Sequence, residues 1–377
     1  MNIGFDAKRA FLNFTGLGNY SRFILASLSE YFPDNNYHLY TPKDNVKREV
    51  RDLTQASNIH VRKPSGFISL FKLSSIWRSY WLGSIAGKEH MNIFHGLSNE
   101  LPFSIPGNLK TVVTIHDLIF LRFPELYKPI DRKIYTKKFK HACEVADKII
   151  AVSQQTAEDI QEFFGTDPSR IEVIYQGCHP NFKVTFEKNA LEEAREKYEL
   201  PQRFLLNVGT IEPRKNALLI LKALTIIKDR YPIPLVIVGR STPYEQILVR
   251  YIRENGLEKQ VKILHQVSFE DLPKIYQLSQ LFIYPSVFEG FGIPIIEALY
   301  SKKPVISSRT SCLPEAGGPG SLYIDPTSPE ELANAIANVL DNDEVVNKMI
   351  QDGLNYIERF ENQKIARDLM AVYQKLV

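Results

Sequence analysis

The chain reads LFIYPSVFEGFGIPIIEAL from Leu281 to Leu299, and the fold class follows from this stretch. Its first four residues are apolar and strand-like, while the residues from Ile293 onward have the apolar spacing of a helix. A glycine-containing turn with one carboxylate, Glu289, joins the two parts, and a second carboxylate, Glu297, falls on the first turns of the helix. This order predicts an α/β sheet with Glu289 at the carboxyl end of a strand, where open sheets of this class bind ligands.

Two carboxylates fixed at separate points can accept hydrogen bonds from both ends of a polyhydroxylated ligand. Between them Gly290 and Gly292 flank Phe291, and glycine lets a backbone approach a ligand closely. The structural alternative is a solvated loop glutamate followed by a helix-start glutamate that favours the helix dipole. The combination of strand, glycine turn and two carboxylates favours the binding interpretation.

Strand-like and helical patterns alternate along the chain, which is typical of parallel sheets with crossover helices. Strands are predicted at 2–6, 37–41, 59–63, 92–95, 110–116, 148–152, 171–175, 204–209, 235–238, 261–264, 281–284, 304–307 and 321–324. Helices are predicted at 18–31, 68–87, 131–146, 154–164, 187–199, 216–230, 328–340 and 343–359. The charged stretch 187–199 ends at a proline between the two halves, so we expect one domain over 1–185 and a second over 186–360.

The composition excludes several classes of protein. A chain of 377 residues can bury two cores, and its net charge of +3 is too small for a protein that coats nucleic acid. The three cysteines lie far apart and predict neither a disulfide framework nor a zinc site, which fits a reducing compartment. The chain starts directly with a strand-like segment and has no apolar run of about 18 residues, so we expect a cytoplasmic protein without a spanning helix.

Two cations, Arg214 and Lys215, follow the predicted strand 204–209 and precede the predicted helix 216–230. Cations at a helix amino terminus oppose its dipole, so this place does not favour stability. It does favour an anionic ligand, because arginine binds phosphate oxygens bidentately and lysine adds a compact charge. The alternative is a solvated basic turn in which Glu212 pairs with one of the cations.

Two further candidate positions lie in the first half. Gly16 and Gly18 precede a helix that starts around Asn19, and such a turn offers backbone N–H groups to a diphosphate. Ser21 stands where the dinucleotide-binding fingerprint has a third glycine, so a plain turn is the alternative.

Two histidines end strands of the first half. His116 closes the strand 110–116, and we expect it to be a hydrogen-bond partner of reacting groups rather than a committed general base; a capped core histidine is the alternative. His95 is a weaker candidate, divided evenly between ligand lining and core.

Three motifs identify a family when taken together. They are TGLGNY at 15–20, GTIEPRKN at 209–216 and PSVFEGFGIPIIEAL at 285–299. The last resembles the E-x7-E motif of the retaining nucleotide-sugar glycosyltransferases of family four. The resemblance implies the GT-B fold, an α/β protein of two facing Rossmann-like domains with parallel sheets and an interdomain cleft. It also implies that residues 361–377 form a helix that crosses back to the N-terminal, acceptor-side domain.

The resemblance also implies a role for each candidate residue. Glu289 would hold the sugar hydroxyls, and Glu297 would hold the ribose hydroxyls. Arg214 and Lys215 would neutralise the leaving diphosphate, and His116 would touch the reacting end. The expected catalytic residues are thus His116, Arg214, Lys215 and Glu289, and the expected donor-binding residues also include Gly16, Gly18, Gly290, Phe291, Gly292 and Glu297, beside the segment 311–315.

The expected reaction moves a hexose, with retention of configuration, from a nucleotide sugar to a glycan or lipid-linked acceptor. Mannose from GDP-mannose is the first choice, because the EPRKN variant at 212–216 resembles bacterial mannosyltransferases of polysaccharide assembly. A UDP-glucose-type donor, a nucleotide-sugar epimerase of the same fold and a non-catalytic nucleotide-sugar-binding subunit are the alternatives. We expect neither a cofactor nor a metal, since protein cations supply the positive charge and Asp341 and Asp343 lie away from the other motifs.

Two segments suggest peripheral contact with an anionic membrane at its inner face. Residues 66–82 place on one helical face Leu70, Leu73, Trp77, Tyr80 and Trp81. Residues 128–140 are rich in lysine and arginine. An aromatic face beside a basic one suits a protein that lies on lipid and receives a lipid-linked saccharide. Two ordinary core-facing helices are the structural alternative, which we favour slightly.

Overall fold

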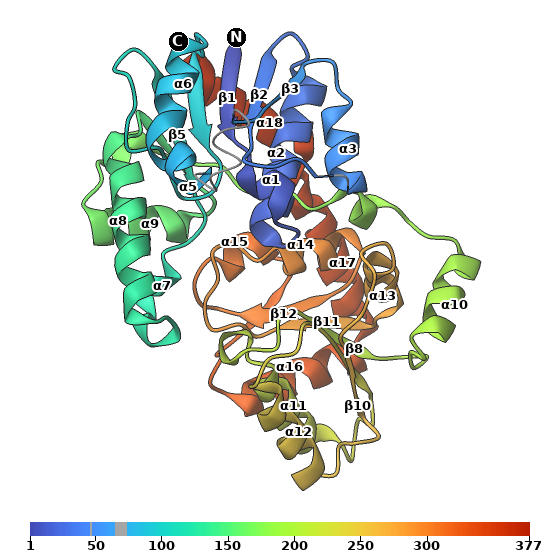
Figure 1. Ribbon diagram of the computed structural model, residues 1–377. Helices are drawn as coiled ribbons and strands as arrows, with labels where there is room; N and C mark the ends of the chain where they lie inside the picture. The colour runs from blue at the N-terminus through green and yellow to red at the C-terminus, as the bar shows by residue number, and fades with distance from the viewer. Residues whose placement is uncertain (46, 65–73) are drawn as a thin grey trace. The chain divides into compact units, whose positions relative to one another are not determined.

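The computed structural model describes residues 1–45, 47–64 and 74–377. The chain divides into two compact units: unit 1 comprises residues 1–177 and 360–377, and unit 2 comprises residues 178–359. Among the described residues, unit 1 holds a parallel sheet of seven strands and unit 2 a parallel sheet of six, each covered by helices (Figure 1). The predicted α/β class with two parallel-sheet domains is confirmed.

The sheet of unit 1 has the strand order β3-β2-β1-β4-β5-β6-β7. Its strands are β1 (Asn2–Asp6), β2 (Asn36–Tyr40), β3 (Ile59–Arg62), β4 (Ile93–Gly96), β5 (Lys110–Ile115), β6 (Lys148–Ala151) and β7 (Ile171–Val173). In β1, Ile3 lies opposite Tyr37 of β2 on one side and Ile93 of β4 on the other. The chain thus leaves β1 toward one edge of the sheet and β4 toward the opposite edge, so the strand order reverses between β1 and β4.

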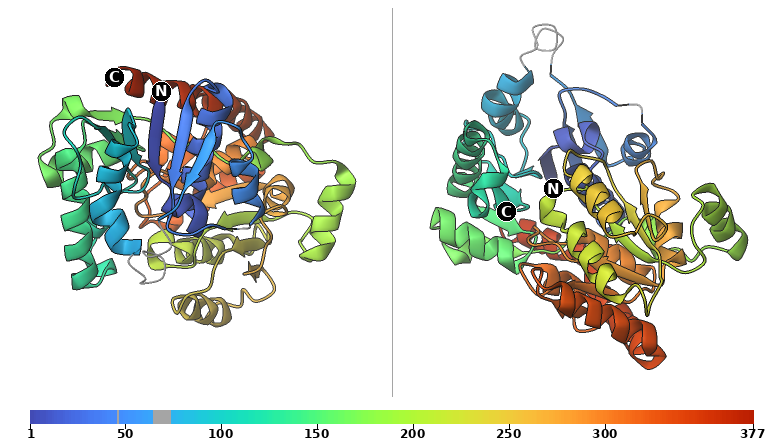
Figure 2. Two further views of the ribbon diagram at one scale, coloured as in Figure 1. Left: turned by 45° about the horizontal axis from the view of Figure 1, so that its top comes forward. Right: turned by 90° about the horizontal axis from the view of Figure 1, so that it is seen from below.

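Helices surround this sheet. They are α1 (Lys8–Leu12), α2 (Gly16–Tyr31), α3 (Arg48–Thr54), α5 (Ser74–Ile76), α6 (Leu82–Lys88), α7 (Ile119–Arg122), α8 (Pro129–Val145), α9 (Gln154–Phe164) and α18 (Asn362–Gln374), with a π-helical turn η1 (Trp77–Trp81) and 3-10 turns η2 (Pro124–Leu126) and η3 (Pro168–Arg170). Ser153 caps α9, because its Oγ accepts the backbone N–H of Thr156 at 3.0 Å. The C-terminal helix α18 packs against α2, so both ends of the chain belong to unit 1 (Figure 2).

The sheet of unit 2 has the order β10-β9-β8-β11-β12-β13. Its strands are β8 (Leu205–Val208), β9 (Leu235–Val238), β10 (Val261–Leu264), β11 (Leu281–Tyr284), β12 (Val305–Ser308) and β13 (Leu322–Ile324). The helices are α10 (Lys188–Lys197), α11 (Ala217–Ile227), α12 (Glu245–Glu254), α13 (Leu272–Leu278), α14 (Ile293–Tyr300), α15 (Leu313–Gly317), α16 (Pro329–Asp341) and α17 (Asp343–Ile357), with 3-10 turns η4 (Pro180–Lys183), η5 (Pro213–Lys215) and η6 (Glu358–Phe360).

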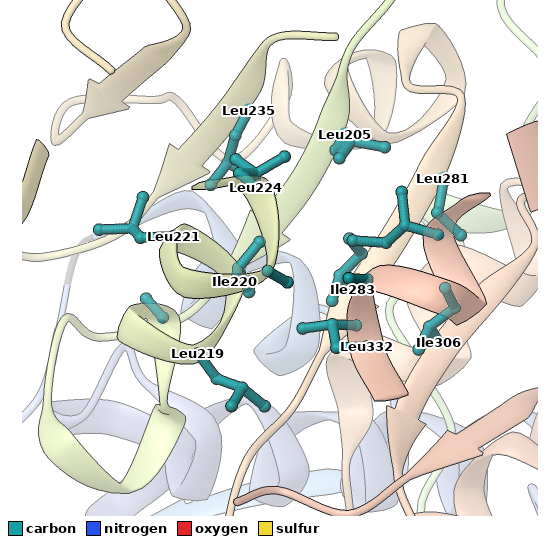
Figure 3. Packing of buried hydrophobic residues seen from close by; sticks show 14 of the residues in the cluster. Leu205, Leu219, Ile220, Leu221, Leu224, Leu235, Leu281, Ile283, Ile306 and Leu332 are labelled. Carbon is teal, nitrogen blue, oxygen red and sulfur yellow. The ribbon is translucent and has the colours of Figure 1, made fainter. Parts of the chain in front are cut away.

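Apolar side chains between the sheet of unit 2 and the helices α11 and α16 form its core (Figure 3). Leu205, Leu281 and Ile283 from the central strands are fully buried, as are Ile220 of α11 and Leu332 of α16. Burying each such side chain contributes roughly 1.5–3 kcal/mol. The packed layer holds the loops after β8 and β11 in place, and these loops carry the candidate site.

The sequence and the structure differ in two places that matter for function. A short helix, α1, follows β1 where no helix was predicted, and α2 begins at Gly16 rather than around Asn19. Gly16 and Gly18 therefore lie in the first turn of a helix and not in a turn before it. The division between the units falls after residue 177, whereas the sequence placed it after residue 185; the intervening turn η4 packs on α14 of unit 2.

Candidate functional site

The strand order of unit 2 reverses between β8 and β11, since β8 leads to β9 on one side and β11 leads to β12 on the other. Open α/β sheets bind ligands at the carboxyl ends of strands where the order reverses. Arg214 and Lys215 lie in η5 after β8, and Glu289 lies in the loop after β11. The structure therefore brings together three of the residues that the sequence singled out.

Glu289 is the centre of this site, and the residue is only 8% exposed. Its Oε1 accepts hydrogen bonds from Lys215 Nζ at 2.6 Å and from Ser286 Oγ at 2.6 Å. Tyr284 Oη also donates to Oε1, at 3.1 Å, while Arg214 Nη1 lies 2.7 Å from Oε2. A carboxylate oxygen has two lone pairs, so among the described residues Oε1 is saturated and Oε2 can accept a further hydrogen bond.

The charge state of Glu289 is set by its neighbours. Burial alone would raise the pKa of Glu289, but the charges of Lys215 and Arg214, with hydrogen bonds from Lys215 and Ser286, lower it to about 2. Glu289 is therefore ionised near neutral pH. Burial and the Glu289 charge raise the pKa of Tyr284 well above its usual value, so its hydroxyl stays neutral and donates to the carboxylate.

The two cations keep donors for a ligand. Arg214 Nη1 also donates to the Phe288 carbonyl at 2.7 Å, and Nη2 donates to Glu212 at 2.7 Å. Lys215 Nζ also donates to Tyr284 Oη at 2.7 Å. Among the described residues, Arg214 thus retains its Nε–H and one Nη2–H, and Lys215 retains one N–H. The carboxylates of Glu212 and Glu289 formally cancel the two cations, so an anion would be bound by these remaining donors rather than by an excess of positive charge.

A left-handed turn fixes the cations against the acidic loop. Asn216 has φ 58°, a conformation that asparagine adopts more readily than most residues, and it begins α11. Its amide Nδ2 donates to the carbonyls of Pro285 at 3.1 Å and Pro326 at 2.8 Å. The backbone N–H of Val287 donates to the carbonyl of Arg214 at 2.9 Å. The loop after β8 and the loop after β11 are thus bonded to each other.

The glycine turn after Glu289 is required by the backbone. Gly292 has φ 116°, where a side chain would be strained, and a Cβ there would lie 3.2 Å from Ala316 Cβ. Phe291 is 3% exposed and its ring packs in the core, so any contact of Phe291 with a ligand would be made by its backbone. Gly290 lies between these buried positions and Glu289 and is half-buried.

Glu297 lies on α14 and has its own partner. Tyr276 Oη donates to Glu297 Oε2 at 2.9 Å. Burial raises the pKa of Glu297 to about 7, against the effect of the Tyr276 hydrogen bond. A carboxylate that is protonated over part of the neutral range can be ionised by a ligand whose hydroxyl groups donate to it.

Several residues of the site were missed by sequence reasoning. Tyr284 and Ser286 bind the Glu289 carboxylate, and Cys312 Sγ lies 3.1 Å from the Glu289 carbonyl and 3.0 Å from the Phe291 carbonyl. Ser311, in the segment that the sequence did single out, donates through Oγ to the Glu289 carbonyl at 2.9 Å. The signal for the first two was their position at the carboxyl end of β11, immediately before the acidic turn.

His116 of unit 1 is a neutral, oriented imidazole. Its Nε2 lies 2.9 Å from the Leu97 carbonyl, which can only accept, so Nε2 carries the proton and Nδ1 is a hydrogen-bond acceptor. Burial, against the effect of the hydrogen bond with the Leu97 carbonyl and together with the charge of Arg9, lowers the pKa of His116 to about 4. The ring of Tyr20, on α2, meets the imidazole edge-on with 4.6 Å between ring centres. This state suits the expected role of a hydrogen-bond partner.

His95 belongs to the core. It is fully buried, and its Nδ1 lies 2.6 Å from Tyr373 Oη of α18 while its Nε2 lies 2.9 Å from Thr114 Oγ1. Thr114 Oγ1 in turn shares a hydrogen bond of 3.0 Å with Tyr20 Oη. The sequence left open whether His95 lines a ligand site or belongs to the core, and the structure supports the core. A buried series of hydrogen bonds connects Tyr373 of α18 through His95 and Thr114 to Tyr20, whose ring contacts His116.

The two N-terminal glycines, Gly16 and Gly18, have different roles. A Cβ at Gly18 would lie 1.8 Å from the Asn13 carbonyl oxygen, so close packing requires glycine there. A Cβ at Gly16 would meet no described atom within 4 Å. Arg22 holds the loop before them by donating to the carbonyls of Ala10 at 2.7 Å and Asn13 at 2.8 Å. The structure gives Gly18 a packing role and leaves Gly16 as the glycine open to a ligand.

The aromatic segment 66–82 and the basic segment 128–140 bury only some of their described side chains in the core. Leu70 and Leu73 lie outside the described residues. Trp77 is buried at 2% exposure, which fits the core-facing alternative, whereas Tyr80 and Trp81 are 53% and 42% exposed. Helix α8 buries Phe139, Ala142 and Cys143 and exposes Lys133, Lys137 and Lys140, and the exposed Lys128 lies just before the helix.

Asp341 pairs with Arg230 at 2.9 Å. Among the described residues, no group of three or more histidines, cysteines and carboxylates is arranged to hold a metal ion. In the same part of the chain, no helix combines the length and the apolar character needed to cross a lipid bilayer.

Comparisons with known proteins agree with this arrangement. Residues 191–356 match the family described as Glycosyl transferases group 1, and residues 24–182 match Glycosyltransferase Family 4. The chain is 27% identical over 390 residues to O-antigen chain mannosyltransferase B of Escherichia coli, with 100% of both proteins covered. It is 28% identical over 263 residues to the O-antigen chain mannosyltransferase RfbU of Salmonella typhimurium, with 69% of each covered.

Solved structures share the fold. The Anabaena protein HepE, crystallised with UDP and glucose, superposes with a TM-score of 0.75 at 18% identity over 100% of both chains. WaaG, a glycosyltransferase involved in lipopolysaccharide biosynthesis, superposes with a TM-score of 0.70 at 16% identity over 99% of both chains. At such identities the likeness concerns the fold, and the predicted GT-B fold is confirmed.

Proposed function

Because this chain belongs to the glycosyltransferases of group 1 and family 4, we propose that it transfers mannose from GDP-mannose to a glycan or lipid-linked saccharide. The observation that carries the proposal is the buried cluster of Glu289 with Arg214 and Lys215 at the point where the strand order of unit 2 reverses. The choice of mannose rests on the two O-antigen mannosyltransferases that the chain resembles.

In this proposal the unpaired donors of Arg214 and Lys215 bind the diphosphate, and their charges are already fixed in place by Glu289. Donors that need no rearrangement stabilise the charge that develops on a leaving diphosphate without a reorganisation cost. Glu289 Oε2, which has acceptor capacity left, takes a hydrogen bond from a mannose hydroxyl. Glu297 accepts from the ribose hydroxyls, and no metal ion is needed.

The proposed chemistry keeps the configuration of the anomeric carbon. The bond between this carbon and the diphosphate oxygen breaks, and a bond to the acceptor oxygen forms on the same face. The proton of the acceptor hydroxyl passes to the departing diphosphate, so no protein nucleophile takes part. His116 contributes its Nδ1 as an acceptor for a hydroxyl at the reacting end, which its low pKa of about 4 supports because the ring stays neutral.

The donor can be tested directly. Purified protein would be incubated with GDP-mannose or with UDP-glucose in EDTA, with and without a membrane lipid extract that carries the acceptor. The proposal expects GDP release from GDP-mannose that depends on the extract. If only UDP-glucose is consumed, the donor is a UDP-sugar and not GDP-mannose. Formation of an isomeric sugar without the extract would indicate an epimerase. Binding of the nucleotide sugar without turnover would indicate a non-catalytic subunit.

We also propose that α8 rests on the inner face of an anionic membrane where a lipid-linked acceptor is presented. Ile130 and Ile134, one helical turn apart, are 67% and 46% exposed, and the exposed Lys133 and Lys137 lie beside them. Apolar and basic side chains on one helix face bind anionic lipid together.

Wild-type protein should sediment with phosphatidylglycerol vesicles and not with phosphatidylcholine vesicles. The double change Lys133→Glu and Lys137→Glu should abolish sedimentation, while Lys88→Glu on α6 should not; equal binding by all three proteins would refute the proposal.

A further inference from the structure

Unit 1 has its own point of strand reversal, between β1 and β4. Two adjacent cations, Lys8 and Arg9, follow β1 there and form the start of α1. Both are half-buried. Since ligands of open α/β sheets bind at the carboxyl ends of strands at such points, this pair occupies a place where a ligand is expected.

The carboxylates near this pair are already engaged by other cations. Asp6 Oδ2 accepts from Arg78 Nε at 2.5 Å. Glu100 Oε2 lies 2.9 Å from Arg78 Nη1 and 3.2 Å from Lys138 Nζ. The carboxylates therefore neutralise Arg78 and Lys138, and the charges of Lys8 and Arg9 are left over.

Neither Lys8 nor Arg9 has a side-chain hydrogen bond or ion pair within the described ranges 1–45, 47–64 and 74–377. The Nε atom of Arg9 is fully buried without a partner. A buried donor left unpaired costs roughly 1–3 kcal/mol, and a charged one more. A negatively charged group bound at this position would remove that cost.

The charges of Lys8, Arg9 and Arg78 influence one another and the pKa values of nearby groups. Burial lowers the pKa of Lys8, and the charges of Arg78 and Arg9 lower it further, while the charges of Asp6 and Glu100 act in the opposite direction. The charge of Arg9 also reaches His116, whose pKa it lowers. The cations at this end of the sheet thus act on one another and on His116, and Asp6 and Glu100 oppose this effect at Lys8 only in part.

We propose that Lys8 and Arg9 bind the phosphate or diphosphate of a phosphate-bearing acceptor substrate. This proposal rests on the proposed function, and it adds that the acceptor is recognised through an anionic linkage as well as through its saccharide. The ammonium of Lys8 and the guanidinium of Arg9 together present donors in the form that binds phosphate oxygens most strongly. The donor's own diphosphate is the other source of the same chemistry.

Inorganic pyrophosphate is a suitable probe, because it contains the proposed chemistry without a saccharide or lipid. It would be titrated calorimetrically into full-length protein saturated with GDP, so that the nucleotide site is filled. Wild type should bind pyrophosphate, and Arg9→Gln and Lys8→Gln should each weaken this binding at least about tenfold, as expected for loss of a hydrogen bond to a charged group. The control Lys43→Gln removes an exposed cation that follows the neighbouring strand β2, and it should bind pyrophosphate like wild type.

Thermal unfolding of the same proteins supplies a second readout. Arg9→Gln and Lys8→Gln should unfold at or above the wild-type temperature, since each removes a repelling charge; a lower temperature would show that the pair serves stability. The proposal would be overturned if GDP-loaded wild type did not bind pyrophosphate, or if both variants bound it as tightly as wild type. Weakened GDP binding in Arg9→Gln would assign the cations to the donor's diphosphate instead. Failure of wild type to bind GDP would reject the proposed function itself, separately from this inference.

Discussion

Replacement of Lys215 by alanine tests the cluster in unit 2 most sharply. Lys215 Nζ lies 2.6 Å from Glu289 Oε1 and is the largest of the charges that hold the pKa of this carboxyl at about 2. Arg214 stays 2.7 Å from Oε2 in the variant, so Glu289 keeps one cation. The change therefore removes a ligand donor without leaving the buried carboxylate unpaired.

The Lys215→Ala change should affect the free energy of unfolding and the turnover number to different extents. Breaking a buried ion pair costs about 3–5 kcal/mol when a charge is left uncompensated, and we expect less here because Arg214 remains. Loss of a group that stabilises charge in the transition state lowers kcat on the order of 100-fold or more. Since each tenfold change corresponds to about 1.4 kcal/mol, this is at least roughly 2.7 kcal/mol of transition-state stabilisation.

The assay is GDP release from GDP-mannose with lipid acceptor, on protein whose fold is checked by circular dichroism. Lys222→Ala is the matched control, because Lys222 is exposed on the adjacent helix α11 and should leave both turnover and stability unchanged. A folded Lys215→Ala protein with turnover within about threefold of wild type would remove Lys215 from the mechanism.

Three other changes have distinct outcomes. Glu289→Gln should reduce mannosyl transfer more than GDP affinity, measured by kcat and by titration, because it alters the acceptor for a sugar hydroxyl; the reverse pattern would contradict the assigned role. For Glu297, stability from the neutral carboxyl is fully present below the unfolded pKa of about 4.5 and is lost as pH rises through about 7. Urea unfolding should thus show a smaller decline in stability from about pH 5 to about pH 8 in Glu297→Gln than in wild type, and parallel curves would disprove the shift. Gly18→Ala should cost about 1–3 kcal/mol in the free energy of unfolding, since its Cβ would overlap a backbone oxygen, while Gly16→Ala should not destabilise; equal effects would refute the packing argument.

Much of the fold could be predicted because the strands of parallel sheets are apolar and short. Strand β11 and the turn after it illustrate this, since Leu281–Tyr284 is buried on both faces and ends at an acidic glycine turn. Helix α1 could not be found in the same way. Its five residues carry too little periodicity, and what holds the loop after it is Arg22, which donates to carbonyls of residues 10 and 13 from the next helix.

The site was predictable where chemistry and strand ends coincide, as for Arg214 and Glu289. Pairing of Glu212 with one of the cations was an alternative from the start, but the additional contact of Arg214 with the distant Glu289 was not expected, so the expected excess of positive charge is formally absent. His95 is a case in which the position at a strand end was not sufficient to predict the role. That position allowed ligand lining, but a hydrogen bond with Tyr373, far away in the sequence, makes His95 part of the core. Partners that are distant along the chain decided both cases.

The central claim is that protein donors, and not a metal ion, hold the diphosphate of the donor nucleotide. Calorimetric affinities for GDP and GMP, measured in EDTA on wild type and on Lys215→Ala, test it most directly. We predict that wild type binds GDP at least about tenfold more tightly than GMP, and that this preference falls sharply in the variant. Equal affinity of wild type for GDP and GMP in EDTA, with a preference for GDP only after magnesium or manganese is added, would contradict the account.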